Sequence, residues 1–326
     1  MFSRKTFWSL VILLGVVGLL RMPAAYAQGC NAHDSVCPDD QCTVIMVGKK
    51  ASTDGSVIST HTCDCGFCDW TWRHVPPADH EPGAMRKIYY FDQFTTDHPS
   101  KGLRWDAIED NFNGLEIPQV SHTYGYLHGA FGYINDNQVA LGESTVGCRE
   151  QMQNNTSAPK FDITMLTMIA MERAKTAREA IQIMGDLAVI YGYGHTDEGE
   201  MLSLSDPNEV WVFEIMPVGP LWTPESGKPG AVWCAQRVPD DHVSICPNES
   251  RIGEIDLNNK DFFMASENVI SFAVEQKLYD PKSGKPFNWK RAYSPSEFSA
   301  TSSNGSRGRL WRFFDLVAPS KKFSPD

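Results

Sequence analysis

The first apolar segment after a polar stretch covers residues 42–47, and a second strand-like segment follows it across a turn. The segment Cys-Thr-Val-Ile-Met-Val is rich in β-branched residues, which is typical of a buried strand. Asp54-Gly55 lies at the centre of the turn, and residues 57–60 predict the returning strand. We therefore expect a β-hairpin that begins at Cys42.

Residues 162–191 form the main helical region of the sequence. Thr176-Ala-Arg-Glu179 is a capping-box pattern, so a helix is expected to begin after Thr176 and to pack against an earlier helix. Its apolar residues recur at spacings of three and four: Ala177, Ala180, Ile181, Met184, Leu187 and Ala188. Residues 252–273 and 308–317 are also predicted to be helical.

Strand patterns occur in runs along the rest of the chain. Residues 131–146 predict two short strands around a turn, and residues 210–215, 231–238 and 242–246 predict consecutive antiparallel strands. The acidic segment 197–200 is expected to be a solvated loop. Because strands and helices are grouped instead of alternating, the pattern favours an α+β fold with antiparallel sheets layered against helices.

Composition narrows the class of protein. The chain has 326 residues, 42% of them hydrophobic, which is too apolar for a disordered chain. It carries 29 Lys and Arg against 40 Asp and Glu, a net charge of −11, and this balance argues against nucleic-acid binding. No second long apolar segment follows the N-terminus, so a polytopic membrane protein is excluded. Oligomerisation remains open.

The N-terminus has the pattern of a signal peptide. Basic residues precede an apolar stretch at 7–20, and Ala25-Tyr26-Ala27 is a small-x-small cleavage pattern. We expect cleavage before Gln28 and export to the periplasm or outside the cell, with no membrane contact afterwards; an uncleaved anchor is the alternative. Residues 28–41 are polar and rich in turn formers, which indicates a linker or a pro-segment.

The nine cysteines agree with export, since an oxidising compartment allows eight to pair and leaves one over. They are Cys30, Cys37, Cys42, Cys63, Cys65, Cys68, Cys148, Cys234 and Cys246. His61 with Cys63, Cys65 and Cys68 has zinc-ligand chemistry, but this spacing is irregular for a zinc finger. Disulfides with Cys30, Cys37 or Cys148 are favoured, and we expect neither a metal nor a cofactor.

Cys42 is the candidate nucleophile. A thiol attacks as its thiolate and needs a base nearby. Cleavage between Gln41 and Cys42 would create an α-amino group on the same residue, with an unperturbed pKa of about 8, which is suited to act as that base. The alternative is a buried structural or disulfide-bonded cysteine.

Six segments resemble, in order, peptidase family C69, a family of cysteine dipeptidases: residues 42–56, 138–145, 172–180, 235–241, 264–266 and 279–287. The resemblance covers most of the chain from residue 42. It implies a domain over 42–326 with an N-terminal nucleophile (Ntn) hydrolase fold, a four-layer αββα sandwich with two antiparallel sheets. It also implies a precursor activated by exposing the cysteine, and short peptides as substrates.

The resemblance also implies roles for four residues. Cys42 matches the nucleophile, Asp64 an aspartate near the α-amine, Asn248 an oxyanion-hole asparagine and Arg309 an active-site arginine. The alternatives are that Asn248 is a turn residue after Pro247 and that Arg309 is a surface charge on a helix.

Three features bear on activity. His61 stands where many family members have arginine, and a neutral imidazole would stabilise a thiolate less. Glu143 and Ser144 either line the pocket or end a strand. Family members usually extend well past the Arg309-Leu-Trp-Arg312 region, whereas this sequence stops at Asp326, so we expect a shortened form. An inactive disulfide-stapled binding protein and a small-amide acylase are therefore alternatives to a dipeptidase.

Overall fold

A three-stranded sheet carries the N-terminal end of the described chain. The computed structural model describes residues 42–63, 72–90, 112–154, 156–194, 198–295 and 303–324, all within one compact unit, Pro38–Asp326. The sheet has the order β14-β1-β2, with antiparallel β1 (Thr43–Val47), β2 (Ile58–Thr62) and β14 (Val243–Cys246). The predicted hairpin from Cys42 is confirmed, with Val44 opposite His61.

The second sheet has eight strands. Its order is β15 (Phe263–Ala265), β13 (Val232–Val238), β12 (Val210–Met216), β11 (Gly199–Ser205), β10 (Ala140–Val146), β9 (Gly132–Asn135), β8 (Tyr126–His128) and β3 (Arg73–Val75). Two further pairs are β4 (Ala78–Asp79) with β7 (His122–Thr123), and β5 (Met85–Tyr89) with β6 (Phe112–Pro118). All strand pairs in these sheets are antiparallel.

The predicted pairing of one strand and the predicted extent of one loop are corrected. The segment 242–246 forms β14, which pairs with β1 instead of β13, because the chain crosses to the smaller sheet beside Gly48, whose N–H donates to His242 O at 2.9 Å. The predicted loop 197–200 is wrong at its end, since Gly199 and Glu200 are buried at the start of β11. A buried charged residue in a strand has no signature in a hydrophobic pattern.

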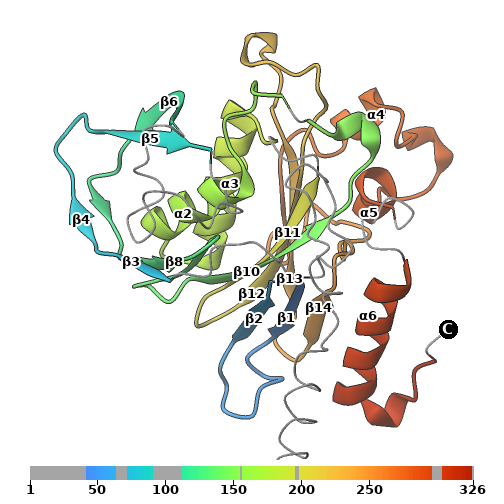
Figure 1. Ribbon diagram of the computed structural model, residues 1–326. Helices are drawn as coiled ribbons and strands as arrows, with labels where there is room; N and C mark the ends of the chain where they lie inside the picture. Colours follow the sequence, from blue (N-terminus) through green and yellow to red (C-terminus); the bar gives the residue numbers. More distant parts are fainter. Residues whose placement is uncertain are drawn as a thin grey trace, which may run out of the picture. The chain divides into compact units, whose positions relative to one another are not determined.

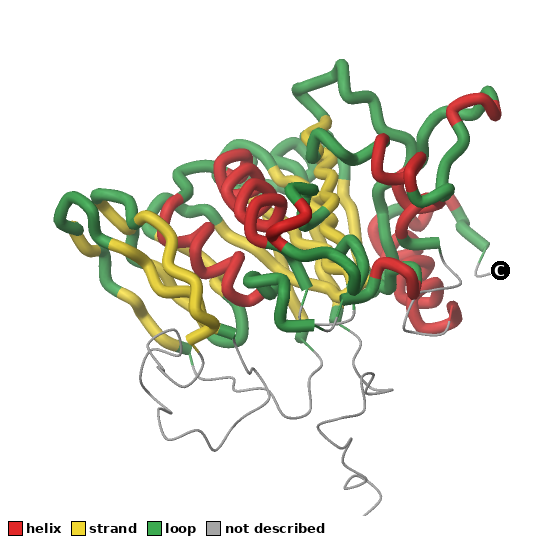
Figure 2. The backbone as a smooth tube through the Cα atoms, turned by 90° about the horizontal axis from the view of Figure 1, so that it is seen from above, coloured by secondary structure: helices red, strands yellow, loops and turns green. Residues whose placement is uncertain are grey.

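The helices α2 (Ile163–Arg173) and α3 (Ala177–Tyr191) confirm the main helical prediction. Thr176 caps α3 by accepting from Glu179 N at 3.2 Å. Both helices pack on the large sheet (Figures 1 and 2). Gly185 allows α3 to approach closely, because a Cβ at that position would lie 2.3 Å from the indole of Trp233.

The C-terminal third holds short helices. They are α4 (Ser271–Glu275) and α5 (Trp289–Tyr293), followed by the longer α6 (Ser303–Val317). The 3₁₀ turns of the described chain are Glu150–Met152, Pro224–Ser226, Pro281–Ser283 and Pro319–Lys321. The helix predicted at 308–317 is confirmed within α6. The helix predicted at 252–273 is wrong, because Ile252 N is held by Glu214 Oε1 and Phe263–Ala265 joins the large sheet. No helix among the described residues is long and apolar enough to span a bilayer.

The two larger sheets pack face to face, with β1 and β2 against β10 and β11. Ser59 Oγ and Ser203 Oγ meet at 2.5 Å across this interface. One apolar core lies between the helices and the large sheet, and a second includes the facing residues of the two sheets. Ile58, Thr60 and Thr62 on the outer side of β2 are exposed, so the described helices do not cover that strand. Of the four expected layers, the structure thus has the two antiparallel sheets and the helices on the large sheet, but no described helix covers β2.

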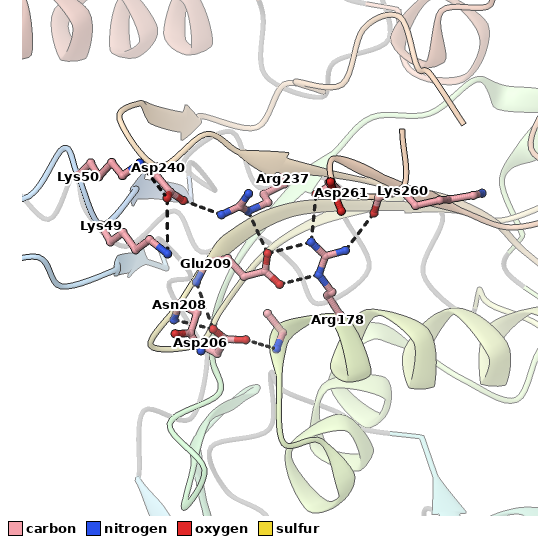
Figure 3. Close-up of polar contacts among 11 residues, drawn as sticks. Lys49, Lys50, Arg178, Asp206, Asn208, Glu209, Arg237, Asp240, Lys260 and Asp261 are labelled. Atoms are coloured by element: carbon pink, nitrogen blue, oxygen red, sulfur yellow. Dashed lines mark hydrogen bonds and ion pairs between the residues drawn. The ribbon is translucent and has the colours of Figure 1, made fainter. Parts of the chain in front are cut away.

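A network of ion pairs closes the end of the sheets at which β1 finishes (Figure 3). Glu209 binds Arg178 (Nε–Oε1 2.7 Å) and Arg237 (Nε–Oε2 2.9 Å). Arg237 Nη2 also lies 2.6 Å from Asp240 Oδ1, and Asp240 Oδ2 lies 3.5 Å from Lys49 Nζ. Glu209 therefore joins the N-terminal turn of α3 to β13 and, through Asp240, to the hairpin.

Replacing Glu209 by glutamine tests this network. Glu209→Gln leaves two arginines facing a neutral amide, so the free energy of unfolding is expected to fall by about 1–3 kcal/mol in chemical denaturation. The matched control is Glu275→Gln, which removes the carboxylate of an exposed pair with Lys228 and should cost less than about 0.5 kcal/mol. Equal losses in the two variants would contradict a stabilising role for the network.

Candidate active site

Cys42 immediately precedes β1, and its side chain is buried. Its carbonyl oxygen accepts from Arg309 Nη1 at 2.7 Å and from Ser144 Oγ at 3.3 Å. Strand pairing of β1 with both β2 and β14 fixes the backbone that follows. Hydrogen bonds to its carbonyl and the pairing of the next residues on both sides therefore hold the backbone of Cys42, and with it the thiol, in place.

Three side chains surround the Cys42 thiol. His61 projects from β2, Cys63 follows the same strand, and Glu143 belongs to β10 of the facing sheet. The donor atoms of Cys42, His61, Cys63 and Glu143 all lie within 4.8 Å of one another. His61 Nε2 lies 3.5 Å from Glu143 Oε2. The site is thus built across the interface of the two sheets.

Gly142 provides the space for His61. A Cβ on Gly142 would lie 2.7 Å from Thr60 O and 3.0 Å from His61 Cβ. The strand β9 pairs with β10 only at Ala140, before Gly142 is reached. His61 therefore lies over a position without a side chain and reaches Glu143.

The protonation states of Cys42 and His61 are coupled. The hydrogen bond to Cys63, burial and the charge of Glu143 raise the pKa of the Cys42 thiol. Burial alone would lower the pKa of His61, but its contacts with Cys42 and Glu143 and the Glu143 charge raise it to about 9. The raised pKa favours the positively charged form of His61 at neutral pH, in contrast to the neutral imidazole expected from the sequence.

A second buried carboxyl group, that of Glu200, lies beside Glu143. Glu200 on β11 is buried beside Glu143, and burial and the Glu143 charge raise its pKa well above the usual range. Burial opposes ionisation of Glu143 as well, but bonds from His61 and Glu200 lower its pKa. Thr145 Oγ1 also donates to Glu143 Oε1 at 3.0 Å. The opposite directions of the two pKa shifts favour ionisation of Glu143 and protonation of Glu200.

Asn248 and Arg309 meet at the same end of β1. Asn248 N donates to Ser144 Oγ at 3.0 Å, and its Nδ2 donates to Thr145 O at 2.9 Å. Arg309 Nη2 donates to Asn248 Oδ1 and to Pro247 O, both at 3.0 Å. Asn248 is indeed in a turn after Pro247, with φ of 59°, but the turn aims it into the site. Arg309 is not a surface charge of α6.

The structure therefore brings together three of the four residues expected from the resemblance, Cys42, Asn248 and Arg309. Asp64 lies outside the described residues, as do Cys30, Cys37, Cys65 and Cys68, so disulfides among those four cysteines stay predictions. The expected pairing of eight cysteines is corrected, because Cys63, Cys234 and Cys246 are free thiols. Sequence reasoning missed Cys63 as a neighbour of Cys42. The spacing of the two residues was an available signal, because side chains two positions apart in an extended segment, such as those of residues 61 and 63, point to the same face.

These features define a mixed α/β protein with a thiol-centred site at the head of a β-hairpin. A sequence profile described as Peptidase family C69 matches residues 41–326, and the chain belongs to this family. It is 28% identical to a probable dipeptidase of Salmonella dublin over 82% of this chain and 56% of that protein. It is 26% identical to a probable dipeptidase of Latilactobacillus sakei over 73% of this chain and 45% of that protein.

A third relative, probable dipeptidase A of Streptococcus pyogenes serotype M1, is 26% identical over 87% of this chain and 56% of its own length. The chain thus spans about half the length of the curated relatives it matches.

Replacing Arg309 by lysine tests how the site is held. Arg309→Lys keeps the charge, but a single ammonium cannot reach the carbonyls of Cys42 and Pro247 and the side chains of Thr43 and Asn248 together. We expect the free energy of unfolding to fall by about 1–3 kcal/mol. Arg312→Lys, three residues along the same helix at an exposed pair with Asp315, should change it by less than about 0.5 kcal/mol. Similar effects in urea titrations of both variants would show that Arg309 does not organise the site.

Proposed function

We propose that this chain is an exported dipeptidase of the Ntn-hydrolase type whose nucleophile is the Cys42 thiol. The observation that carries the proposal is the arrangement around Cys42 at the head of β1, with Ser144 and Arg309 on its carbonyl and His61 beside its thiol. The family and the names of the relatives support a peptidase. The two facing antiparallel sheets are consistent with the Ntn fold.

Processing supplies the base. While Cys42 is joined to Gln41, its nitrogen belongs to an amide, which has no basic lone pair. Cleavage of that bond converts the nitrogen into an α-amine with an unperturbed pKa of about 8, close to the thiol and able to take its proton directly or through water. Removal of residues 1–27 as a signal peptide and 28–41 as a pro-segment therefore activates the enzyme.

Catalysis then follows the acyl-transfer sequence. The Cys42 sulfur attacks the carbonyl carbon of the scissile bond of a short peptide, and the proton from the thiol passes through the α-amine to the departing amine as the C–N bond breaks. A thioester remains on Cys42. Water attacks it, the carboxylic acid leaves, and the thiol regains its proton.

Asn248 and Arg309 have different roles in this mechanism. The Nδ2 amide of Asn248 is the proposed donor to the oxyanion of the tetrahedral intermediate, a contribution of about 3 kcal/mol when one such donor is removed from other hydrolases. Arg309 is a positioning residue, because its guanidinium binds the Cys42 carbonyl and orients the Asn248 amide by donating to Oδ1.

The test combines protein chemistry with kinetics. The mature secreted protein should begin at Cys42 on N-terminal sequencing and hydrolyse dipeptides. Cys42→Ala should lower kcat/KM by at least about 1000-fold, because the covalent route is lost. Cys234→Ala is the matched control, since Cys234 is a buried cysteine of the large sheet and its loss should leave kcat/KM within about threefold. An active protein that still begins before Cys42, or an active Cys42→Ala variant, would refute the mechanism.

A further inference from the structure

Two thiols, an imidazole and a carboxylate converge on one point in this chain. They are Cys42 Sγ, a ring nitrogen of His61, Cys63 Sγ and a carboxylate oxygen of Glu143, all within 4.8 Å of one another. Three of these residues, His61, Cys63 and Glu143, have no part in the proposed acyl-transfer steps. The convergence of these four side chains is therefore not explained by the proposed reaction.

The donor set matches the preferences of zinc. Thiolates and imidazole are the usual ligands of structural zinc, and carboxylates complete many sites. In a zinc tetrahedron the donor atoms lie about 3.4–3.8 Å apart. Donors that are at most 4.8 Å apart reach that spacing when each moves by less than about 1 Å toward a common centre.

A second observation points to the same ligand. The His61 side chain is nine-tenths buried, and among the described residues its Nε2 has no hydrogen-bond partner of good geometry, the contact with Glu143 Oε2 being 3.5 Å long. The Nε2 atom is thus paired with Glu143 by charge but not by a close hydrogen bond. A cation between His61 and Glu143 would give this atom a ligand bond.

The surroundings suit a bound cation as well. Thr145 Oγ1 donates to Glu143 Oε1 and orients the carboxylate, as outer-shell partners of metal ligands do. Gly142 leaves room beside His61, and Phe131 and Tyr133 flank the imidazole at centroid distances of 5.8 and 6.1 Å. The ligands are thus held on β2 and β10 and at the residues directly before β1 and after β2, from both sheets.

We propose that Cys42, His61, Cys63 and Glu143 bind one Zn²⁺ ion and that this ion reversibly inhibits the enzyme. Binding displaces the protons of the two thiols and of the imidazole, and the ion takes the place of the imidazolium charge beside Glu143. The Cys42 sulfur is then a metal ligand and does not attack a peptide. The inhibition rests on the proposed function of Cys42, whereas the metal site does not.

The site is tested with the full chain, reduced and metal-free under anaerobic conditions. Titration with Zn²⁺ should give one bound ion, and Co²⁺ should give thiolate-to-metal charge-transfer absorption typical of two sulfur ligands. Cys63→Ala should weaken Zn²⁺ binding by at least about tenfold, since loss of even an outer-shell partner costs about 10–100-fold. The matched control, Cys234→Ala, should bind Zn²⁺ like the unmodified chain.

A measurement on the unmodified chain covers the case in which Cys63→Ala does not fold. Stoichiometric Zn²⁺ should protect Cys42 and Cys63 together from iodoacetamide, as mapped by mass spectrometry, and a chelator should restore labelling. Absence of a one-to-one complex, unprotected thiols, or equal affinity in Cys63→Ala and the control would overturn the metal site.

Activity assays separate this inference from the proposed function. Zinc should abolish dipeptide hydrolysis by the mature protein, and a chelator should restore it. If zinc binds through these residues but no dipeptide is hydrolysed, the proposed function fails and the site stands. If hydrolysis depends on Cys42 but zinc neither binds nor inhibits, the inference fails and the proposed function stands.

Discussion

The close approach of the two sheets at Gly142 determines how His61 lies relative to Glu143. A side chain there would collide with the backbone of Thr60 and the Cβ of His61, so the sheets would separate and His61 would lose its position over Glu143. Because protein interiors are close-packed, such a displacement spreads to neighbouring strands. The contact between Ser59 and Ser203 crosses the same interface and depends on the same distance between the two sheets.

Burial of charge is the second constraint. His61, Glu143 and Glu200 are charged or titratable groups inside the protein, and a buried charge is tolerated only when it is paired. The pair His61–Glu143 carries opposite charges, and Glu200 keeps its proton because a second carboxylate charge so close would be repelled. The thiol of Cys42 therefore lies beside a compensated pair, and its protonation follows that of its neighbours.

Local patterns predicted local structure well. The hairpin from Cys42 and the helix capped by Thr176 follow from β-branched runs, turn residues and capping chemistry, which act over a few residues. The pairing of β14 with β1 and the burial of Glu200 did not follow, because both depend on contacts between distant segments. For the site, a resemblance supplied Asn248 and Arg309, whereas the proximity of Cys63 to Cys42 required the three-dimensional arrangement.

His61 and Cys63 have a joint effect on the chemistry of the site. An arginine at position 61 would bring a permanent positive charge to the thiol and cannot bind a metal. Histidine keeps a positive charge while protonated, as Glu143 ensures, but becomes a ligand when the proton leaves. Cys63, two residues farther on, adds a soft donor on the same face. These two residues leave the nucleophile in place and give the same four side chains two mutually exclusive states, one that favours acyl transfer and one that favours metal binding.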